Sequence, residues 1–244
     1  MTRRCSFLLG FCCALLPLLT QANVVVGGTR VIYPAQETEV SLGLTNKGEQ
    51  PALVQVWIDD GSADSRPDDV DVPFVVMPPM VRINQGKGQT LRIAHIPRPG
   101  IPGDRESVYW LNILDVPPLP ADQVSNHMQL AFRTRLKLFL RPEKLSGNAV
   151  EAAQTLRWSL IGSGPGRVLR VRNDSAFHVS FNSVQVKLKS GHVLKVRSHM
   201  LAPKSSADFP LEQKSSSAEA QGRVVYEWIS DHGSSVRREA ALEL

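Results

Sequence analysis

The residue types that most often carry catalysis or bind metals are present, but their spacing does not assemble a reaction centre. The six histidines are scattered, with no His-x-x-x-His pair and no carboxylate at metal-binding spacing on the same element. The aspartates between residues 59 and 71 do not follow a calcium loop and lack its final glutamate. We therefore expect no metal, no cofactor and no enzymatic activity. The histidines are His95, His127, His178, His192, His199 and His232.

Nucleophiles and phosphate-binding loops are also missing. No serine lies in a Gly-x-Ser-x-Gly elbow. Residues 162–166 are rich in glycine but lack the Lys-Ser/Thr of a phosphate loop. The three cysteines, Cys5, Cys12 and Cys13, all lie near the start of the chain. A chain that loses this segment has neither a thiol nucleophile nor a disulfide.

Residues 1–22 have the form of a secretory signal peptide. Arg3 and Arg4 precede an apolar core at residues 7–19, and Thr20-Gln21-Ala22 is a small-x-small cleavage site. The apolar run is too short to span a membrane, so we expect export across an inner membrane, cleavage after Ala22 and no membrane insertion. The remaining chain is mildly basic, which does not favour nucleic-acid binding, and it is long enough for two domains.

One segment stands out among those that would position side chains. From Met128 to Leu140, apolar residues occupy every even position except Thr134, and mostly polar or basic residues occupy the odd ones. This alternation predicts a β-strand with one apolar face. It would span about 43 Å, and it is longer than the usual strand of about 3–10 residues. Large apolar residues on a long edge strand favour aggregation unless a partner covers them. A strand in the protein's own core is the alternative interpretation.

The rest of the chain is a series of short strand-like segments separated by turns, with no long segment of helical periodicity. We predict an all-β fold, with an immunoglobulin-like sandwich at residues 23–143 and a second, smaller β domain at 144–244. Pro142 and residues 146–148 mark the connection. Strands are expected at 24–33, 39–46, 53–59, 74–77, 80–84, 89–96 and 108–116, and again at 156–161, 168–172, 179–188, 192–196, 207–211 and 224–230.

Several blocks of the sequence resemble the periplasmic pilus (fimbrial) chaperones of bacterial chaperone–usher systems. The resemblance covers almost all of the chain after residue 22. Its most specific blocks are Asp-Arg-Glu-Ser at 104–107 and Lys-Leu-Phe-Leu-Arg-Pro at 137–142. Met77, Gly103 and Leu140 depart from the Thr, Gln and Tyr that are common in the family. The other matching blocks are residues 28–34, 54–60, 73–74, 78–79, 91–93, 109–112, 133–136 and 230–233.

The resemblance implies two immunoglobulin-like β-sandwich domains in an L or boomerang arrangement. It also implies a periplasmic chaperone that is not an enzyme. Such a protein binds, folds and caps pilin subunits by donor-strand complementation and delivers them to an outer-membrane usher. The short connection at residues 117–126 resembles the branch of the family with a short F1–G1 loop, which serves rod-like pili.

The resemblance also implies roles for individual residues. Arg30 and Lys137 match two cations that hold the C-terminal carboxylate of a pilin. Leu136 and Leu138 are expected in the protein's own core. The residues expected to contact the pilin groove are Asn126, Met128, Leu130 and Phe132, and those of an interdomain charge cluster are Glu106, Arg141 and Asp231.

Without the resemblance, the same residues have ordinary interpretations. Arg30 and Lys137 would be solvated surface cations, and the apolar side of the long strand would be core. The alternative function is then a secreted β-sandwich adhesin or structural surface protein, which needs neither the cation pair nor an exposed apolar ladder. The aggregation argument also allows a homodimer that covers the donor edge, but no residue specifies one.

Overall fold

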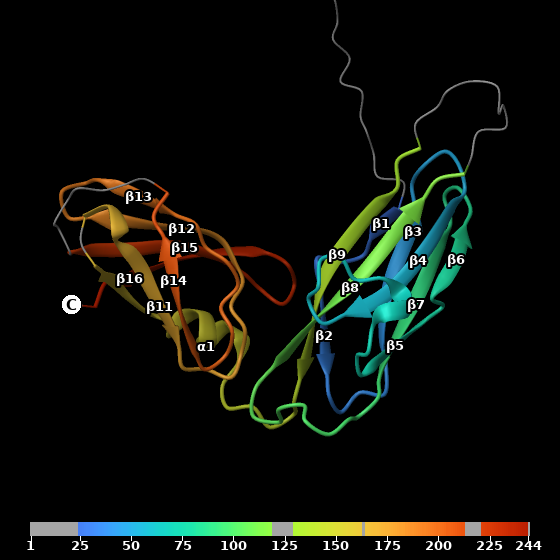
Figure 1. Ribbon diagram of the computed structural model, residues 1–244, viewed down its shortest axis with the longest axis horizontal. Helices are drawn as coiled ribbons and strands as arrows, with labels where there is room; N and C mark the ends of the chain where they lie inside the picture. The colour runs from blue at the N-terminus through green and yellow to red at the C-terminus, as the bar shows by residue number, and fades with distance from the viewer. Residues whose placement is uncertain (1–23, 119–128, 163, 213–220, 244) are drawn as a thin grey trace, which may run out of the picture.

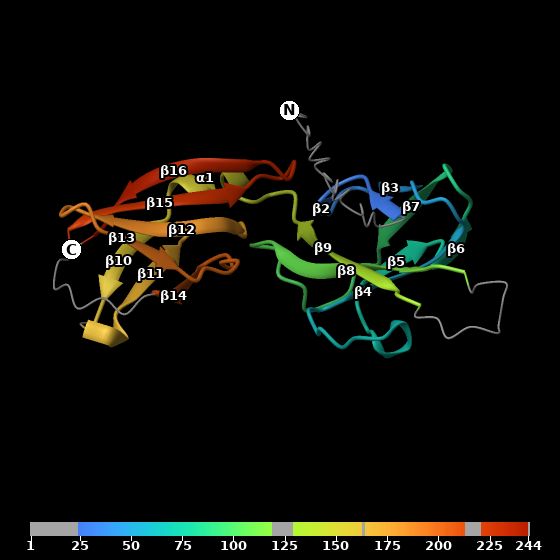
Figure 2. The ribbon, with the colours of Figure 1, turned by 90° about the horizontal axis from the view of Figure 1, so that it is seen from above.

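The computed structural model describes residues 24–118, 129–162, 164–212 and 221–243. The predicted signal peptide lies outside these ranges, as do Asn126 and Met128. Two β-sandwiches lie next to each other and meet at one end, which gives the molecule a bent, open shape (Figure 1). A view from above shows them as two separate bodies joined in the middle (Figure 2). The predicted all-β fold of two sandwiches is confirmed.

The first sandwich packs a four-stranded sheet on a five-stranded sheet. Alternate residues of both sheets fill its core, among them Tyr33, Leu91 and Leu138, which are fully buried. The four-stranded sheet has the order β1 (Val24–Val26), β3 (Val40–Asn46), β7 (Gly88–His95) and β5 (Phe74–Met77). The five-stranded sheet has the order β2 (Arg30–Pro34), β9 (Phe132–Arg141), β8 (Ser107–Val116), β4 (Ala52–Asp59) and β6 (Met80–Ile83).

The single strand predicted at residues 24–33 is wrong, because this segment changes sheet. β1 pairs with β3, whereas β2 pairs with β9 in the other sheet. The chain crosses at Gly27, whose N–H donates to the carbonyl oxygen of Gly43 at 2.8 Å. A Cβ at position 27 would lie only 3.1 Å from that oxygen. Glycine therefore allows the close backbone approach that the crossing requires.

The long strand begins later than the alternation predicts. β9 starts at Phe132, so residues 129–131 lie outside it. Its antiparallel neighbour β8 sets this limit, because the last pair in the register joins Asp115 to Phe132. Residues 117 and 118 are prolines, which have no N–H with which to continue the ladder.

Within the described ranges, only the second half of β9 has a strand on both sides. β2 pairs with it in parallel, from Arg30 opposite Lys137 to Pro34 opposite Arg141. Among the described strands, residues 132–136 pair with β8 alone. The first half of β9 is therefore a sheet edge, and the second half lies inside the sheet.

The second sandwich packs a three-stranded sheet on a four-stranded sheet around the buried rings of Trp158, Phe209 and Tyr226. It begins with a short helix, α1 (Ala149–Gln154), which the sequence reading did not predict and which is capped by the side chain of Asn148. The smaller sheet has the order β10 (Arg157–Ile161), β11 (Val168–Asn173) and β14 (Ser205–Pro210). The larger has the order β13 (Val193–Val196), β12 (Phe181–Leu188), β15 (Gly222–Ile229) and β16 (Ser235–Ala241). Two 3-10 turns, η1 (Pro67–Asp69) and η2 (Gly164–Gly166), complete the elements.

Candidate functional site

Two cations from neighbouring strands lie where the sandwiches meet. Arg30 and Lys137 are directly opposite each other in the β2–β9 pair, and both are partly buried. Each side chain reaches the second sandwich. Arg30 Nη1 donates to the carbonyl oxygen of Ile229 at 2.9 Å, and Lys137 Nζ donates to Ser180 Oγ at 3.2 Å. The position of both charges therefore depends on both domains.

The electrostatics of this pair suit an anion. Burial lowers the pKa of Lys137, and the positive charge of Arg30 lowers it further. Burial also lowers the pKa of Arg30, while the more distant Asp231 and Glu106 act in the opposite direction. No carboxylate in the described part of the chain lies within ion-pair distance of either cation. Two adjacent, partly dehydrated positive charges without such a partner form a site that a carboxylate would neutralise.

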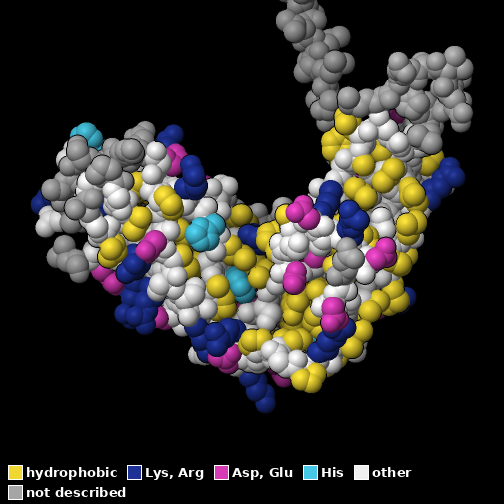
Figure 3. Space-filling model, viewed as in Figure 1, with side chains coloured by type: hydrophobic (Ala, Val, Ile, Leu, Met, Phe, Trp, Pro, Cys, Tyr) yellow, Lys and Arg dark blue, Asp and Glu magenta, His cyan; other side chains and the backbone are white. Residues whose placement is uncertain are grey.

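The open end of β9 presents apolar side chains to solvent. Phe132 is 49% exposed, and Leu130, just before the strand, is 57% exposed. On the same strand, Leu136 and Leu138 are buried in the core of the first sandwich, as the sequence predicted. The space-filling view shows a hollow between the two sandwiches and hydrophobic side chains gathered over the first one (Figure 3). The apolar ladder of β9 thus continues past the end of its own core.

Two arginines of β9 stack on tryptophans of β8 and β4, the next two strands of the sheet, and sequence reasoning missed this stacking. The guanidinium carbon of Arg133 lies 4.8 Å from the ring centre of Trp57, and that of Arg135 lies 4.8 Å from that of Trp110. Arg135 also lies 2.8 Å from the buried carboxylate of Asp59. The sequence did contain a signal for this stacking, because an Arg-x-Arg pattern occurs in one predicted strand and a tryptophan occurs in each of two others.

Asp59 is charged despite its burial. Burial raises the pKa of its carboxyl, but hydrogen bonds from Ser65, Asn112 and the Gly61 N–H, together with the charge of Arg135, outweigh it. The pKa of Asp59 therefore lies below its usual value. This network ties the polar face of β9 to the loop after β4.

The three residues of the predicted interdomain charge cluster are in contact. Arg141 Nε donates to Glu106 Oε1 at 2.7 Å, and its Nη1 and Nη2 donate to the two carboxylate oxygens of Asp231 at 2.8 and 3.1 Å. The buried carboxylate of Glu106 also accepts the backbone N–H of His178 at 2.8 Å, and the Glu106 N–H donates to the carbonyl oxygen of Ala176 at 2.9 Å. The cluster thus joins the first sandwich to two segments of the second.

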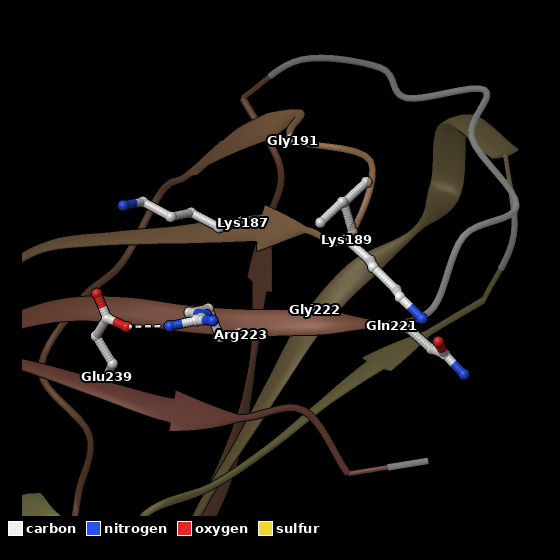
Figure 4. A pocket seen from close by; sticks show the side chains of 8 residues that line it. Lys187, Lys189, Gly191, Gln221, Gly222, Arg223 and Glu239 are labelled. Atoms are coloured by element: carbon white, nitrogen blue, oxygen red, sulfur yellow. Dashed lines mark hydrogen bonds and ion pairs between the residues drawn. The ribbon is translucent and has the colours of Figure 1, made fainter.

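A separate basic hollow of about 510 Å³ lies at the far end of the second sandwich. In Figure 4, the amino groups of Lys187 and Lys189 point away from each other. Arg223 is paired with Glu239 at 2.9 Å. Its two lysines point apart and its arginine is already paired, so this hollow lacks the two adjacent cations without a carboxylate partner that Arg30 and Lys137 provide.

Comparisons with known proteins agree over nearly the whole described chain. Residues 23–146 match the family "Pili and flagellar-assembly chaperone, PapD N-terminal domain", and residues 151–240 match "Pili assembly chaperone PapD, C-terminal domain". The chain is 40% identical over 224 residues to the probable fimbrial chaperone YadV of Escherichia coli K12, covering 91% of this chain and 90% of the relative. It is 42% identical over 226 residues to the chaperone protein FimB/FhaD of Bordetella pertussis, covering 91% and 89%.

Solved structures give the same result. The crystal structure of the YadV chaperone has a TM-score of 0.78 and 38% identity, covering 91% of this chain and 100% of the other. The structure of the Salmonella enterica SafA pilin in complex with the SafB chaperone has a TM-score of 0.73 and 28% identity, covering 90% and 96%. The comparisons give no support to the alternative of a surface adhesin. Within the described ranges, no helix is long and apolar enough to cross a membrane.

Proposed function

The chain belongs to the family of periplasmic pilus-assembly chaperones, which are not enzymes, and we propose that it captures pilin subunits in the hollow between its sandwiches. The observation that carries this proposal is the pair Arg30 and Lys137. Two partly buried cations lie side by side, with no carboxylate at ion-pair distance among the described residues, at the point where β9 changes from interior strand to open edge.

A subunit's C-terminal carboxylate fits between the two cations. Charge-assisted hydrogen bonds of this kind contribute about 1.5–3 kcal/mol each. From that anchor, the subunit's last strand pairs with the open edge of β9, a mode of strand addition for which chaperone–pilin complementation is an established example. Leu130 and Phe132 then enter the subunit's incomplete core, and each contributes about 1.5–3 kcal/mol if fully buried.

The two cations and the apolar side chains of β9 contribute differently to this mechanism. The carboxylate fixes the register, because a slip of one residue would turn the wrong face of the strand inward. The ladder supplies most of the buried area. Asn126 and Met128, which lie outside the described residues, are proposed to extend the same contact. Glu106, Arg141 and Asp231 hold the domain angle and do not touch the subunit.

The remaining parts of the proposal concern partners and maturation. The chain is exported with residues 1–22 as its signal peptide, cleaved after Ala22, and folds as domains 23–143 and 144–244. It delivers bound subunits to an outer-membrane usher. The SafA–SafB complex supports the pilin partner, because its chaperone has the same fold at 28% identity. In the absence of subunits, the open edge of β9 is where a second copy would pair.

The test is capture of subunits in the periplasm of the native host. Tagged wild type and Lys137→Ala are purified, and the accompanying proteins are identified by mass spectrometry. We expect pilin subunits with the wild type and at least a tenfold loss with Lys137→Ala, because the carboxylate loses half of its anchor. Circular dichroism and thermal unfolding should show an intact fold.

The matched control is Lys189→Ala, which removes an exposed lysine from the second sandwich. This variant should retain subunits at the wild-type level. Full subunit yield with Lys137→Ala would refute the anchor assignment. A wild type that retains no subunit would refute capture itself.

A further inference from the structure

The two cations of the proposed anchor have similar surroundings. Each makes one hydrogen bond to the second sandwich. Each also lies near an aromatic ring of the first sandwich. The guanidinium carbon of Arg30 is 5.8 Å from the ring centre of Phe139, and Lys137 Nζ is 5.6 Å from that of Trp110. An aromatic ring therefore borders both charges, in addition to the second sandwich.

Lys137 needs such a contact more than Arg30 does. The ammonium group of a lysine lies at the end of a flexible stem, whereas the guanidinium group of an arginine is a rigid plane. Among the described residues, Lys137 Nζ makes one hydrogen bond, to Ser180 Oγ at 3.2 Å, which is at the long end of the usual range. Burial and the charge of Arg30 both lower the pKa of Lys137. The ammonium group is thus poorly compensated while the site is empty.

Trp110 lies where it can supply this compensation. It is directly opposite Lys137 in the β8–β9 register, and the face of an indole attracts a cation within about 6 Å of the ring centre. The same ring stacks on Arg135 at 4.8 Å, but the charge of Arg135 is balanced by Asp59 at 2.8 Å. Lys137 has no carboxylate at ion-pair distance in the described part of the chain. The ring therefore matters more to Lys137 than to Arg135.

The loop after β4 defines the position of the indole. Gly61, at φ 120°, lies beside the ring, because a Cβ on this residue would be 3.4 Å from Trp110 Nε1. The N–H of Gly61 donates to Asp59 Oδ1 at 2.7 Å, and Arg135 donates to the same oxygen at 2.8 Å. Two groups held by Asp59 thus border Trp110, so the ring has a fixed place relative to β9.

We propose that Trp110 is a positioning residue of the anchor, whose indole holds the ammonium group of Lys137 beside Arg30. A subunit's carboxylate then meets both charges at once. Trp110 acts through Lys137 and not on the carboxylate directly. The inference rests on the proposed capture of subunits and adds a residue that the sequence pattern did not single out.

The test measures how strongly the anchor prefers a carboxylate. A synthetic peptide with the C-terminal sequence of a co-purified subunit is made as the free acid and as the C-terminal amide. Both are titrated into each purified variant by isothermal calorimetry. The wild type should prefer the acid, and Trp110→Leu should reduce this preference about three- to tenfold. Trp110→Phe, which keeps an aromatic face, should retain most of the preference. The affinity for the amide shows in each variant that the rest of the binding surface is intact.

Two controls separate positioning from a general effect on the sheet. Trp57→Leu removes an indole that stacks on Arg133 of the same strand, and it should leave the preference at the wild-type value. In Lys137→Met, adding Trp110→Leu should not change the preference further, because the ring has no ammonium group left to hold.

Four results would each overturn the role of Trp110. They are an unchanged preference in Trp110→Leu, an equal loss in Trp110→Phe, an equal loss in Trp57→Leu, and additive losses when Trp110→Leu is combined with Lys137→Met. A wild type that binds the acid and the amide equally would refute the anchor itself. Failure of the proposed function is therefore distinguishable from failure of this inference.

Discussion

At the scale of residues, the proposed anchor holds two positive charges close together. Arg30 and Lys137 are neighbours in the strand register, and Lys137 is partly buried with its pKa lowered by that burial and by Arg30. A lowered lysine pKa means that the folded state disfavours the ammonium form relative to the unfolded chain. Lys137 therefore reduces stability at neutral pH in the absence of an anion, and a bound carboxylate removes that cost.

Replacing the ammonium group with an apolar one should separate stability from function. Lys137→Met should raise the midpoint of thermal unfolding at pH 7 by about 1–3 °C, because a buried like charge is replaced by an apolar group of similar length. It should also eliminate subunit capture. Differential scanning calorimetry of Lys137→Met beside Lys189→Met tests this. A large drop in the midpoint would mean that Lys137 stabilises the empty protein.

Asp59, unlike Lys137, stabilises the folded protein at neutral pH. Its pKa is lowered in the folded state, so its stabilisation is present above the pKa of an unfolded aspartate, about 3.9, and is lost as pH falls through the lower folded value. Asp59→Asn should reduce the free energy of unfolding at pH 7 by about 2–3 kcal/mol and flatten the loss of stability below pH 4. Urea unfolding between pH 2 and pH 7 measures both. An acid limb unchanged from that of the wild type would contradict the assignment.

At the scale of elements, β9 has two halves with different neighbours. The alternation of the sequence predicted a strand here, and the family resemblance added the burial of Leu136 and Leu138. It did not predict the start at Phe132, because that limit is set by where β8 stops pairing and by the prolines at 117 and 118. The change of sheet at Gly27 was missed for a similar reason, since it depends on an approach to Gly43 on another strand. The local sequence pattern therefore predicted which face of a strand is buried better than it predicted where the strand begins and ends.

A single negative charge at either of two adjacent positions tests which face of the open end of β9 enters the subunit. Phe132→Glu should weaken subunit binding by at least about 100-fold, because it places an unpaired charge in an apolar groove. Ala131→Glu adds the same charge at an exposed position on the other face. It should retain capture in the same co-purification assay. Equal losses in both variants would indicate general charge repulsion in place of an oriented ladder.

At the scale of the whole molecule, the site depends on the angle between the sandwiches. Arg30 bonds Ile229 and Lys137 bonds Ser180 across the junction, so a change of angle would move the cations relative to their partners. Spacing along the sequence could not have paired Glu106, Arg141 and Asp231, and only the family resemblance grouped them. Neither the spacing nor the resemblance predicted the hydrogen bond from the backbone N–H of His178 to Glu106, because that contact exists only when the two domains meet.

Removal of the central cation of the cluster should loosen the junction. Arg141→Ala leaves the buried carboxylate of Glu106 without a cation, which should cost about 3–5 kcal/mol. We expect separate melting of the two domains in calorimetry and a broader distribution of distances in small-angle X-ray scattering. Arg170→Ala is the control, because its partner Asp208 lies on the surface of the second sandwich. A single transition and an unchanged scattering curve for Arg141→Ala would show that other contacts hold the angle.

The boundary between the covered and open halves of β9 has a consequence for the subunits themselves. β2 closes the edge from Lys137 onward, so an added strand must stop there and can grow only in one direction. The register of a bound subunit (the client) would then be set by the position of the subunit's last residue. One extra residue at a client's C-terminus would exchange its inward and outward side chains, whereas a two-residue extension would restore the alternation and only shift which residues are seated. Subunits that differ in sequence, but whose inward-facing residues lie at the same distances from the C-terminus, should therefore be interchangeable.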